Sequence, residues 1–516
     1  MANQDEFIQL INKGYTFSTN SIVVGTAMLD GKAIPNTPIR IPLKTMNRHG
    51  LIAGATGTGK TKTIQSLSEQ LAENGVSVLM MDIKGDFSGI AEPGVSNPKI
   101  EERVAAIGNK WTPKGYPVEL MSISNQDGIR LRATVSEFGP VLISKILDLN
   151  DTQQSVVAMV FKFSDDEQLP LVDLSDFKKV MQFLTNEGKA TFEKDYGSIS
   201  PATMGTILRK VVELEQQGAG IFFGEKSFDV NDLLRKDENG YGYINIVRLT
   251  DIQDKPKLFS TFMLSLLAEV YHTFPERGDV EQPELIIFMD EAHLIFNNAS
   301  KALQEQLEAI IKLIRSKGVG IFFCTQNPID IPQSILAQLG LKVQHALRAF
   351  TAQDRQAIKL AAQNYPETPF YKVEDLMTQL GIGEAFVSAL NEKGIPTPLA
   401  HTLMAPPQSR MDILSEAEMK TLIAASKLYP KYKNPVDPES AYEILTAKIE
   451  QAQQQQAAED QAAQQAKETA TTKTTKQEKS TLDKVLSNTV TRQIARTATS
   501  TLARGLLGVL KGMLKK

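Results

Sequence analysis

The sequence predicts an α/β fold with a mostly parallel sheet, a helical insertion and a helical C-terminal tail. An apolar run at residues 51–53 leads into a glycine-rich loop and then into a helical pattern that ends at Gly75. Four further apolar runs are separated by helical patterns, at residues 76–81, 243–249, 285–289 and 320–324. Strands that are apolar at nearly every position are typical of parallel sheets with helices on both faces.

This pattern predicts a core that is interrupted once and followed by smaller segments. Residues 1–45 are short and β-rich, and we expect them to pair with the edge of the sheet. The stretch at 451–480 is rich in Gln, Ala, Thr and Lys and has no aromatic residue, so we expect a solvated helix that frays into a linker. The other expected segments are the core at 46–97 and 243–407, a mostly helical insertion at 98–242, C-terminal helices at 408–450 and a basic amphipathic tail at 481–516.

The composition excludes several classes of protein. The 42% hydrophobic fraction is ordinary for a globular protein, and no stretch approaches the roughly 18 apolar residues of a membrane span. Cys324 is the only cysteine, which excludes an internal disulfide framework and fits a reducing compartment. Because the first residues lack a signal-peptide pattern, we expect a cytoplasmic location. The net charge of −4 argues against a wholly basic nucleic-acid binder, although it allows a local basic channel.

The loop after the first core strand carries the most specific motif. Residues 54–61 fit G-x-x-x-x-G-K-[ST] without a mismatch, in the strand–loop–helix context that the motif requires. Its glycines let backbone N–H groups turn toward phosphate oxygens, and the helix N-terminus adds a partial positive charge. Lys60 can reach the β- and γ-phosphates of ATP, and Thr61 can hold Mg²⁺. The predicted nucleotide-binding residues are Gly54, Ala55, Thr56, Gly57, Thr58, Gly59, Lys60, Thr61 and Lys62.

The strand at 285–289 ends in two carboxylates, Asp290 and Glu291. We predict that Asp290 joins the Mg²⁺ shell and that Glu291 activates the water that attacks the γ-phosphate. The alternative is a buried strand that ends in solvated acids. Downstream of a complete phosphate loop, the pair indicates hydrolysis rather than binding alone.

Two other strand ends carry polar side chains. Asp82, Lys84 and Asp86 follow the second core strand, and the carboxyl ends of parallel strands face the ligand crevice. They are therefore expected near the nucleotide, unless they form a plain polar loop. Gln326 follows the strand at 320–324 and is our candidate sensor of the γ-phosphate; the alternative is a turn residue.

The tail at 481–516 has apolar residues at every fourth position and many basic residues against a single acid, Asp483. Steps of four advance the apolar stripe by about 40° each, so one straight helix cannot hold them all on one face. Gly505 and Gly508 are expected to break it into two amphipathic pieces. The tail is interpreted as a helix docking on its own domain or on a neighbouring subunit, an anionic-membrane surface helix, or a DNA-contacting segment.

Together these motifs resemble the HerA/FtsK superfamily of ring ATPases, and most closely its HerA-like branch. The resemblance covers roughly residues 40–400 and rests on the sequence at 47–61, 82–87, 290–291 and 325–326 and on the helical insertion. It implies a RecA-like P-loop NTPase, a homo-hexameric ring and the use of ATP and Mg²⁺ to move DNA. It also implies a nuclease or another protein partner.

The resemblance assigns roles to residues of this sequence. The phosphate, metal, base and sensor positions correspond to Lys60, Thr61, Asp290, Glu291 and Gln326. Arg48 and Arg315 resemble arginines that such enzymes place at the site between subunits, where an arginine finger neutralises charge on the γ-phosphate. For Arg315 the alternative is a surface charge on a helix, and Arg348 and Arg355 are further candidates.

Two departures from the family pattern bear on the partners. Residues 1–53 are the only ones before the phosphate loop, so we expect the β-barrel of HerA enzymes to be absent or reduced. Asn327 stands where many relatives have arginine. We therefore predict a Mg-ATP-hydrolysing ring ATPase that acts as a DNA translocase or helicase. The alternative is a nucleotide-dependent assembly ATPase or switch that docks on a membrane or a protein through its tail.

Overall fold

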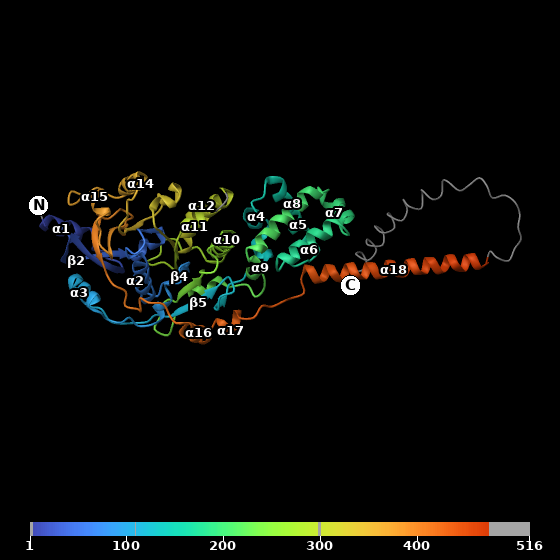
Figure 1. Ribbon diagram of the computed structural model, residues 1–516, viewed down its shortest axis with the longest axis horizontal. Coiled ribbons are helices and arrows are strands. Elements are labelled where there is room, and N and C mark those ends of the chain that lie inside the picture. Colours follow the sequence, from blue (N-terminus) through green and yellow to red (C-terminus); the bar gives the residue numbers. More distant parts are fainter. Residues whose placement is uncertain (1–3, 109, 298–300, 474–516) are drawn as a thin grey trace. The chain divides into compact units, whose positions relative to one another are not determined.

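The computed structural model describes residues 4–108, 110–297 and 301–473 (Figure 1). Contacts among these residues define a sheet unit, 4–133 with 214–436, and a helical unit, 134–213 with 437–473. Among the described residues no helix combines the length and the apolar character that crossing a membrane requires.

The sheet unit is built on one sheet, which has 12 strands within the described residues. Their spatial order is β2-β1-β12-β11-β10-β3-β9-β8-β4-β7-β5-β6. Neighbours from β10 to β6 are parallel, whereas β11, β12, β1 and β2 are antiparallel to theirs. The strands are β1 (Ser21–Leu29), β2 (Lys32–Pro42), β3 (Gly50–Ala53), β4 (Ser77–Asp82), β5 (Val118–Ser122), β6 (Ile129–Arg130), β7 (Ile244–Arg248), β8 (Leu285–Met289), β9 (Val319–Thr325), β10 (Leu341–Gln344), β11 (Glu384–Ser388) and β12 (Ala400–Met404).

The helices of the sheet unit lie mainly between successive strands. They are α1 (Gln4–Tyr15), α2 (Lys60–Glu73), α3 (Pro98–Ile107), α9 (Ala219–Phe222), α10 (Pro256–Thr273), α11 (His293–Asn297), α12 (Lys301–Ile314), α13 (Gln333–Leu336), α14 (Ala352–Ala362), α15 (Val373–Met377), α16 (Glu416–Ala425) and α17 (Tyr429–Tyr432). The 3-10 turns are η1 (Leu43–Arg48), η2 (Ser88–Ala91), η3 (Val230–Leu234), η4 (Arg315–Lys317) and η5 (Pro328–Asp330).

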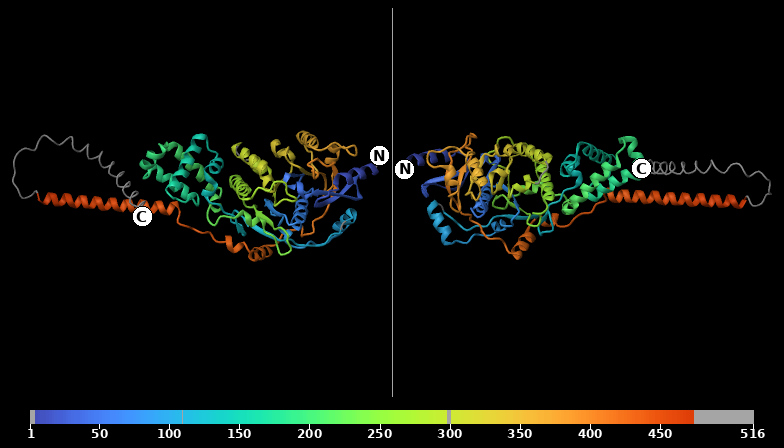
Figure 2. Two further views of the ribbon diagram at one scale, coloured as in Figure 1. Left: turned by 180° about the vertical axis from the view of Figure 1, so that it is seen from behind. Right: turned by 45° about the horizontal axis from the view of Figure 1, so that its top comes forward.

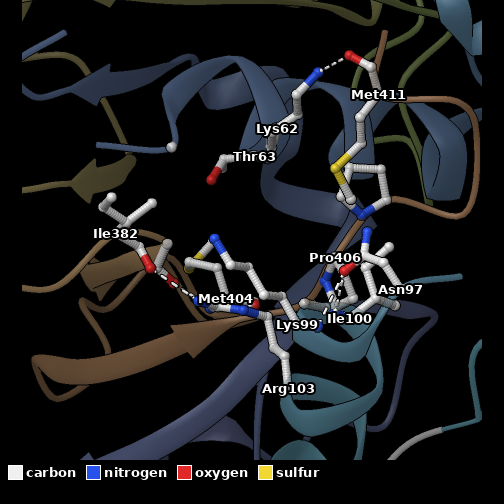
Figure 3. A pocket seen from close by; sticks show the side chains of 14 residues that line it. Lys62, Thr63, Asn97, Lys99, Ile100, Arg103, Ile382, Met404, Pro406 and Met411 are labelled. Carbon is white, nitrogen blue, oxygen red and sulfur yellow. Dashed lines mark hydrogen bonds between the residues drawn. The ribbon is translucent and has the colours of Figure 1, made fainter. Parts of the chain in front are cut away.

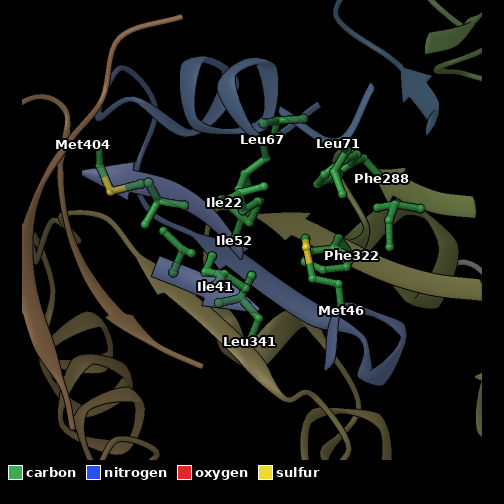
Figure 4. Packing of buried hydrophobic residues seen from close by; sticks show 14 of the residues in the cluster. Ile22, Ile41, Met46, Ile52, Leu67, Leu71, Phe288, Phe322, Leu341 and Met404 are labelled. Carbon is green, nitrogen blue, oxygen red and sulfur yellow. The ribbon is translucent and has the colours of Figure 1, made fainter. Parts of the chain in front are cut away.

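Helices cover both faces of the parallel part of the sheet. Leu67 of α2 belongs to the same buried cluster as Ile52 of β3 and Phe322 of β9 (Figure 4). On the other face the ring of Phe323 lies 5.7 Å from that of Phe296 in α11. Successive residues of a strand point to opposite faces, so two neighbouring phenylalanines anchor both layers of helices.

The pairing of four central strands positions the functional residues. β3 pairs with β9, β9 with β8, and β8 with β4, all in parallel. Their carboxyl ends therefore lie at one edge of the sheet, which we call the carboxyl edge. The four loops that leave these strands, after Ala53, Asp82, Met289 and Thr325, therefore lie close together at the carboxyl edge.

The helical unit contains the long helix α18 and residues 134–213 of the predicted insertion, whereas residues 98–133 and 214–242 belong to the sheet unit. The side chain of Asp176 in α6 accepts hydrogen bonds from Oγ of Ser440 at 2.5 Å and from the N–H of Tyr442 at 2.8 Å. These bonds join α6 to the start of α18. The helices of this unit are α4 (Val135–Ile146), α5 (Asp151–Asp166), α6 (Leu174–Thr185), α7 (Lys189–Tyr196), α8 (Pro201–Gln216) and α18 (Ala441–Lys473).

The structure differs from the expected helical insertion at its start, because β5 and β6 extend the parallel sheet. The sequence hides β5, since Glu119 interrupts its apolar run. Within the fold this carboxylate is buried and forms an ion pair with Arg235. A charge that is paired inside the protein thus disguises a buried strand.

The structure agrees with the expectation for the N-terminal element and differs in part from that for residues 451–480. β1 pairs with β12, as expected for the N-terminal element. Residues 451–473, expected to form a solvated helix that frays into a linker, are helical throughout as part of α18 (Figure 1, Figure 2). Gln and Ala favour helix even where little is buried. The rest of the predicted linker and the tail at 481–516 lie outside the described residues.

Candidate nucleotide site

The phosphate loop, residues 54–59, joins β3 to α2 as predicted. Gly54 and Gly59 adopt φ angles of 154° and 118°, which side chains rarely tolerate. A Cβ at Gly54 would lie 2.5 Å from Cβ of His345, and one at Gly59 would lie 3.2 Å from Cα of Gly383. The loop therefore requires glycine at both positions, and its backbone is free to curl around a phosphate.

Lys60 begins α2 with its side chain turned back across this loop. Its Nζ donates hydrogen bonds to the carbonyl oxygens of Gly54 and Ala55 at 2.5 and 3.1 Å. Burial lowers the pKa of Lys60, and the positive charge of Lys84 lowers it further. The ammonium group is thus held within the curl, where a phosphate oxygen can replace the carbonyls as its partner.

Thr61, Asp86 and Asp290 form the candidate metal side of the site. Oγ1 of Thr61 donates to Oδ2 of Asp86 at 3.2 Å, while Oδ1 of Asp86 is buried without a hydrogen-bond partner among the described residues. Burial, together with neighbouring carboxylates, raises the pKa of Asp290 to about 7. Hydroxyl and carboxylate oxygens suit Mg²⁺, and a cation or its water would satisfy the unpaired oxygen of Asp86. These residues therefore fit Mg²⁺.

Glu291 lies at a sharp turn after β8, with a left-handed φ of 47°. Its Oε1 forms an ion pair with Nζ of Lys84 and accepts a long hydrogen bond, 3.5 Å, from Nε2 of Gln326. Nδ1 of His293 lies 3.2 Å from Oε2, in a geometry without a hydrogen bond. Burial raises the pKa of Glu291, but the bond and charge of Lys84, together with His293 and Gln326, outweigh burial and hold it below its ordinary value. Glu291 is therefore ionised, as a general base must be, but Lys84 occupies Oε1, one of its two proton-accepting oxygens.

A buried aspartate shapes the loop that carries Lys84 and Asp86. The Asp82 carboxylate accepts hydrogen bonds from the N–H groups of Gly85, Asp86 and Phe87 at 2.7, 3.1 and 3.4 Å. Burial raises the pKa of Asp82 to about 6, and the charge of Asp86 adds to the effect. Asp82 therefore acts on the backbone, whereas Asp86 reaches Thr61 in the first turn of α2 and Lys84 reaches Glu291 after β8.

Arg48 and Arg315 lie close together, but away from the phosphate loop of their own chain. Each precedes the amino end of a strand, β3 or β9, whereas the phosphate loop follows the carboxyl end of β3. Burial lowers the pKa of Arg315, and the charge of Arg48 lowers it further. His49 links the two segments: its Nδ1 accepts from the N–H of Ile321 at 3.0 Å, so its Nε2 is the atom that donates to the carbonyl of Ile311 at 2.9 Å.

Lys62 and the remaining arginines also lie outside the phosphate loop. Nζ of Lys62 donates to the carbonyl of Met411 at 2.5 Å, and both residues line the pocket beside α2 (Figure 3). Arg348 and Arg355 are exposed, before and within α14. The structure thus brings together Lys60, Thr61, Asp290, Glu291 and Gln326, and separates Arg48 and Arg315 from them.

A pocket of about 230 Å³ adjoins the first turn of α2 (Figure 3). Gly59 and Thr63 form its wall toward the phosphate loop, and Met404, Pro406 and Met411 give it apolar character. Sequence reasoning missed this pocket. Its walls come from the α2 turn, α3 and the chain around β12, which only the fold brings together.

Arg103 of α3 forms one side of this pocket (Figure 3). Its Nη1 donates to the carbonyls of Gly383 and Met404 at 2.9 and 3.2 Å, and its Nη2 donates to that of Ile382 at 2.8 Å. Burial lowers the pKa of Arg103. The guanidinium group is therefore fixed at its edges and leaves a flat face for a planar ligand.

Comparison with known proteins finds related sequences. The model of a family described as Helicase HerA-like C-terminal matches residues 28–516. The DNA double-strand break repair helicase HerA of Sulfolobus acidocaldarius is 21% identical over 363 residues, covering 69% of this chain and 66% of the relative. The protein of the same name from Saccharolobus solfataricus is 21% identical over 362 residues, covering 68% and 64%. The chain thus spans slightly less than two thirds of the length of these relatives.

A solved structure shares the architecture. The bacterial conjugative coupling protein TrwBdeltaN70, in its unbound monoclinic form, aligns with a TM-score of 0.50 and 13% identity, over 79% of this chain and 94% of that one. At this identity the likeness concerns the fold alone. The prediction of an α/β, RecA-like fold with a mostly parallel sheet is confirmed.

Proposed function

The chain belongs to the helicase HerA-like C-terminal family, and from this premise we propose that it hydrolyses ATP with Mg²⁺ and uses the energy to move or unwind DNA. The observation that carries the proposal is the position of Glu291 beside the phosphate loop. Lys84 pairs with Glu291, and Asp86, two residues later, bonds Thr61. A candidate general base and a phosphate-binding loop thus share the carboxyl edge, as hydrolysis requires.

In this proposal each group at the carboxyl edge has one role. The loop at 54–59 and Lys60 hold the phosphates of ATP. Thr61 and Asp290 hold Mg²⁺ with Asp86 beside them, and the bound ion stabilises charge on the transferred phosphoryl group. Glu291 accepts a proton from the attacking water.

Gln326 acts as the sensor of the γ-phosphate. Gln326 follows the end of β9, and its Nε2 lies 3.5 Å from Oε1 of Glu291. An amide beside the base can hydrogen-bond the attacking water or a phosphate oxygen, so it links the occupancy of the site to the position of Glu291.

The pocket beside α2 is proposed to take the base and ribose of ATP. It begins at Gly59 and Thr63, in the same turn that receives the phosphates. The apolar side chains of Met404 and Met411 suit a flat base, and the guanidinium plane of Arg103 can stack on it.

Arg315, with Arg48 beside it, is proposed to act on the nucleotide of a neighbouring copy. Both arginines lie at the amino ends of strands, opposite the carboxyl edge of their own chain. Arginines that cannot serve their own site suit a ring in which each site is completed by the next subunit. We propose a homo-hexamer, as the HerA/FtsK resemblance implies.

DNA is the proposed substrate because relatives of this chain are named as DNA repair helicases. A nuclease or another protein partner, and DNA or membrane contact through residues 481–516, belong to the same proposal.

The test is the ATPase rate of the full chain with and without single- and double-stranded DNA. We expect hydrolysis that DNA accelerates severalfold, and loss of hydrolysis in Lys60→Ala. An unchanged rate in Lys60→Ala would overturn the site. Hydrolysis without any response to DNA would instead favour a nucleotide-dependent assembly ATPase that docks through its tail.

A further inference from the structure

We propose that Lys84 is a latch on Glu291 that the γ-phosphate releases. Lys84 holds Glu291 until a nucleoside triphosphate enters, and then moves to the γ-phosphate, which frees Glu291 to activate water. This inference rests on the proposed ATPase function and adds to it a residue that senses triphosphate at the same site.

The exposure of the two partners decides which one can move. Lys84 and Glu291 follow the neighbouring strands β4 and β8. The side chain of Glu291 is 6% exposed, whereas that of Lys84 is 37% exposed. The anion is fixed inside the protein, while the cation sits on a flexible four-carbon stem that is open to the site.

The ion pair opposes the proposed work of Glu291. A carboxylate oxygen that bonds an ammonium group is a weaker proton acceptor than a free one. Oε1 is held by Lys84 and by the long bond from Gln326, and His293 lies 3.2 Å from Oε2. Departure of Lys84 would leave Oε1 with the long amide bond alone, in a position to accept a proton from water.

The arriving nucleotide can draw Lys84 away. The charges of Lys84 and Lys60 repel one another, so the two ammonium groups lie near the same part of the site. A γ-phosphate held by Lys60 brings more negative charge than the single charge of Glu291, and charge-assisted bonds to phosphate are strong. A diphosphate has no γ-phosphate to offer. The latch should therefore respond to triphosphate and not to diphosphate.

The chemical step then balances without a further reactant. The water oxygen forms a bond to the γ-phosphorus while the bond from that phosphorus to the bridging oxygen of ADP breaks. The electron pair of the broken bond stays on ADP, and the proton of the water passes to Glu291. Lys84 remains on the γ-phosphate and follows it as inorganic phosphate leaves.

The test measures dissociation constants of the full chain by calorimetry, for Mg-ADP and for Mg-adenylyl imidodiphosphate, a non-hydrolysable ATP analogue. We expect Lys84→Met to weaken binding of the analogue about tenfold, as loss of one charge-assisted bond does, with binding of ADP unchanged. Glu291→Gln removes the competitor for Lys84, so it should tighten binding of the analogue by about threefold or more and leave ADP unchanged.

The double variant makes the test specific. If Glu291→Gln acts by releasing Lys84, its gain must vanish when Lys84→Met is already present. A gain that persists in the double variant would overturn the latch. So would a loss in Lys84→Met that is equal for ADP and analogue. Lys84→Gln replaces Lys84→Met if the latter unfolds at a lower temperature than the wild type.

Lys44→Met is the matched control. Lys44 also forms an ion pair, with Glu281, and its side chain is 32% exposed, but it lies before β3 and away from the carboxyl edge. It should leave both dissociation constants unchanged. Failure of the wild type to bind either nucleotide would contradict the proposed function itself. Normal binding without the two opposed shifts would contradict only the latch.

Discussion

Arg103 illustrates how much a single side chain contributes to the proposed base pocket. Its three hydrogen bonds hold the carbonyls of Ile382, Gly383 and Met404 in place. Gly383 also faces the phosphate loop, because a Cβ on Gly59 would lie 3.2 Å from its Cα. Loss of the guanidinium group should therefore loosen the pocket wall and the adjacent loop together.

We predict that Arg103→Met weakens ATP binding about tenfold or more, because it removes the stacking surface and three hydrogen bonds that hold the pocket wall. Equilibrium binding of a fluorescent ATP analogue measures the loss. Arg130→Met is the control, since Arg130 is also half-buried but lies on β6 at the far end of the sheet. Equal effects of the two substitutions would contradict a base-binding role for Arg103.

The position of some site residues in the fold could be predicted from the sequence, and that of others could not. Asp290 and Glu291 were predictable because they directly end an apolar run, so their strand carries them to the carboxyl edge. The sequence also placed Lys84 near that edge, but the ion pair with Glu291 depends on β4 and β8 being neighbours. Nothing local indicates the role of Arg103, whose partners lie about 280 residues away in the chain.

At the scale of elements, residues 405–414 form a strap that runs along α2 after β12, with contacts from Glu69 through Gln65 to Lys62. Glu69 of α2 is 2% exposed and accepts hydrogen bonds from the N–H groups of Gln408 and Ser409 at 2.8 and 3.0 Å. Oγ of Ser409 donates to the same carboxylate at 2.5 Å. The strap also supplies Pro406 and Met411 to the pocket, so Glu69 holds the pocket wall to the phosphate-loop helix.

The strap gives the chain a predicted pH dependence. Burial raises the pKa of Glu69 to about 7, from an ordinary 4.5. The folded chain therefore holds this proton more tightly than the unfolded chain. The resulting stability is complete below about pH 4.5 and is lost as pH rises through about 7. This difference between the pKa values of Glu69 in the folded and unfolded chain corresponds to about 3 kcal/mol of the free energy of unfolding.

We predict that Glu69→Gln gains stability relative to the wild type as pH rises from 5 to 7.5, because the amide does not ionise. Thermal unfolding of both proteins at several pH values measures the difference. A difference that stays constant across this range would contradict the assignment to Glu69.

Elements whose sequence agrees with their surroundings were the predictable ones. β4, β8 and β9 are buried along their whole length and read directly as apolar runs. β5 is also fully buried, but its Glu119 needs Arg235, more than a hundred residues later, to be tolerated there. Local pattern predicts an element only where the partners of its polar groups are water or near neighbours.

At the scale of the whole molecule, Arg48 and Arg315 lie at the amino ends of the parallel strands, whereas the phosphate loop lies at their carboxyl ends. A single chain thus carries a nucleotide site at the carboxyl edge and candidate arginine fingers at the amino ends of β3 and β9. Since His49 ties Arg48 to α12, the two arginines should move as one group. The geometry gives a role to Arg315 only if another copy of the chain supplies the nucleotide.

We predict that Lys60→Ala and Arg315→Ala are each nearly inactive as ATPases and that mixing the two restores part of the activity. In a mixed ring, some sites combine the intact loop of an Arg315→Ala chain with the intact arginine of a Lys60→Ala chain. An arginine finger contributes about 10³-fold or more to hydrolysis, so even a minority of complete sites is measurable. Subunits must be exchanged by denaturation and refolding, or co-expressed, and ATPase activity compared with that of each variant alone.

The double variant Lys60→Ala/Arg315→Ala mixed with Lys60→Ala is the matched control and should stay inactive. Activity of Arg315→Ala equal to that of the wild type, or no recovery in rings shown by mass to contain both chains, would contradict completion of the site by a neighbour.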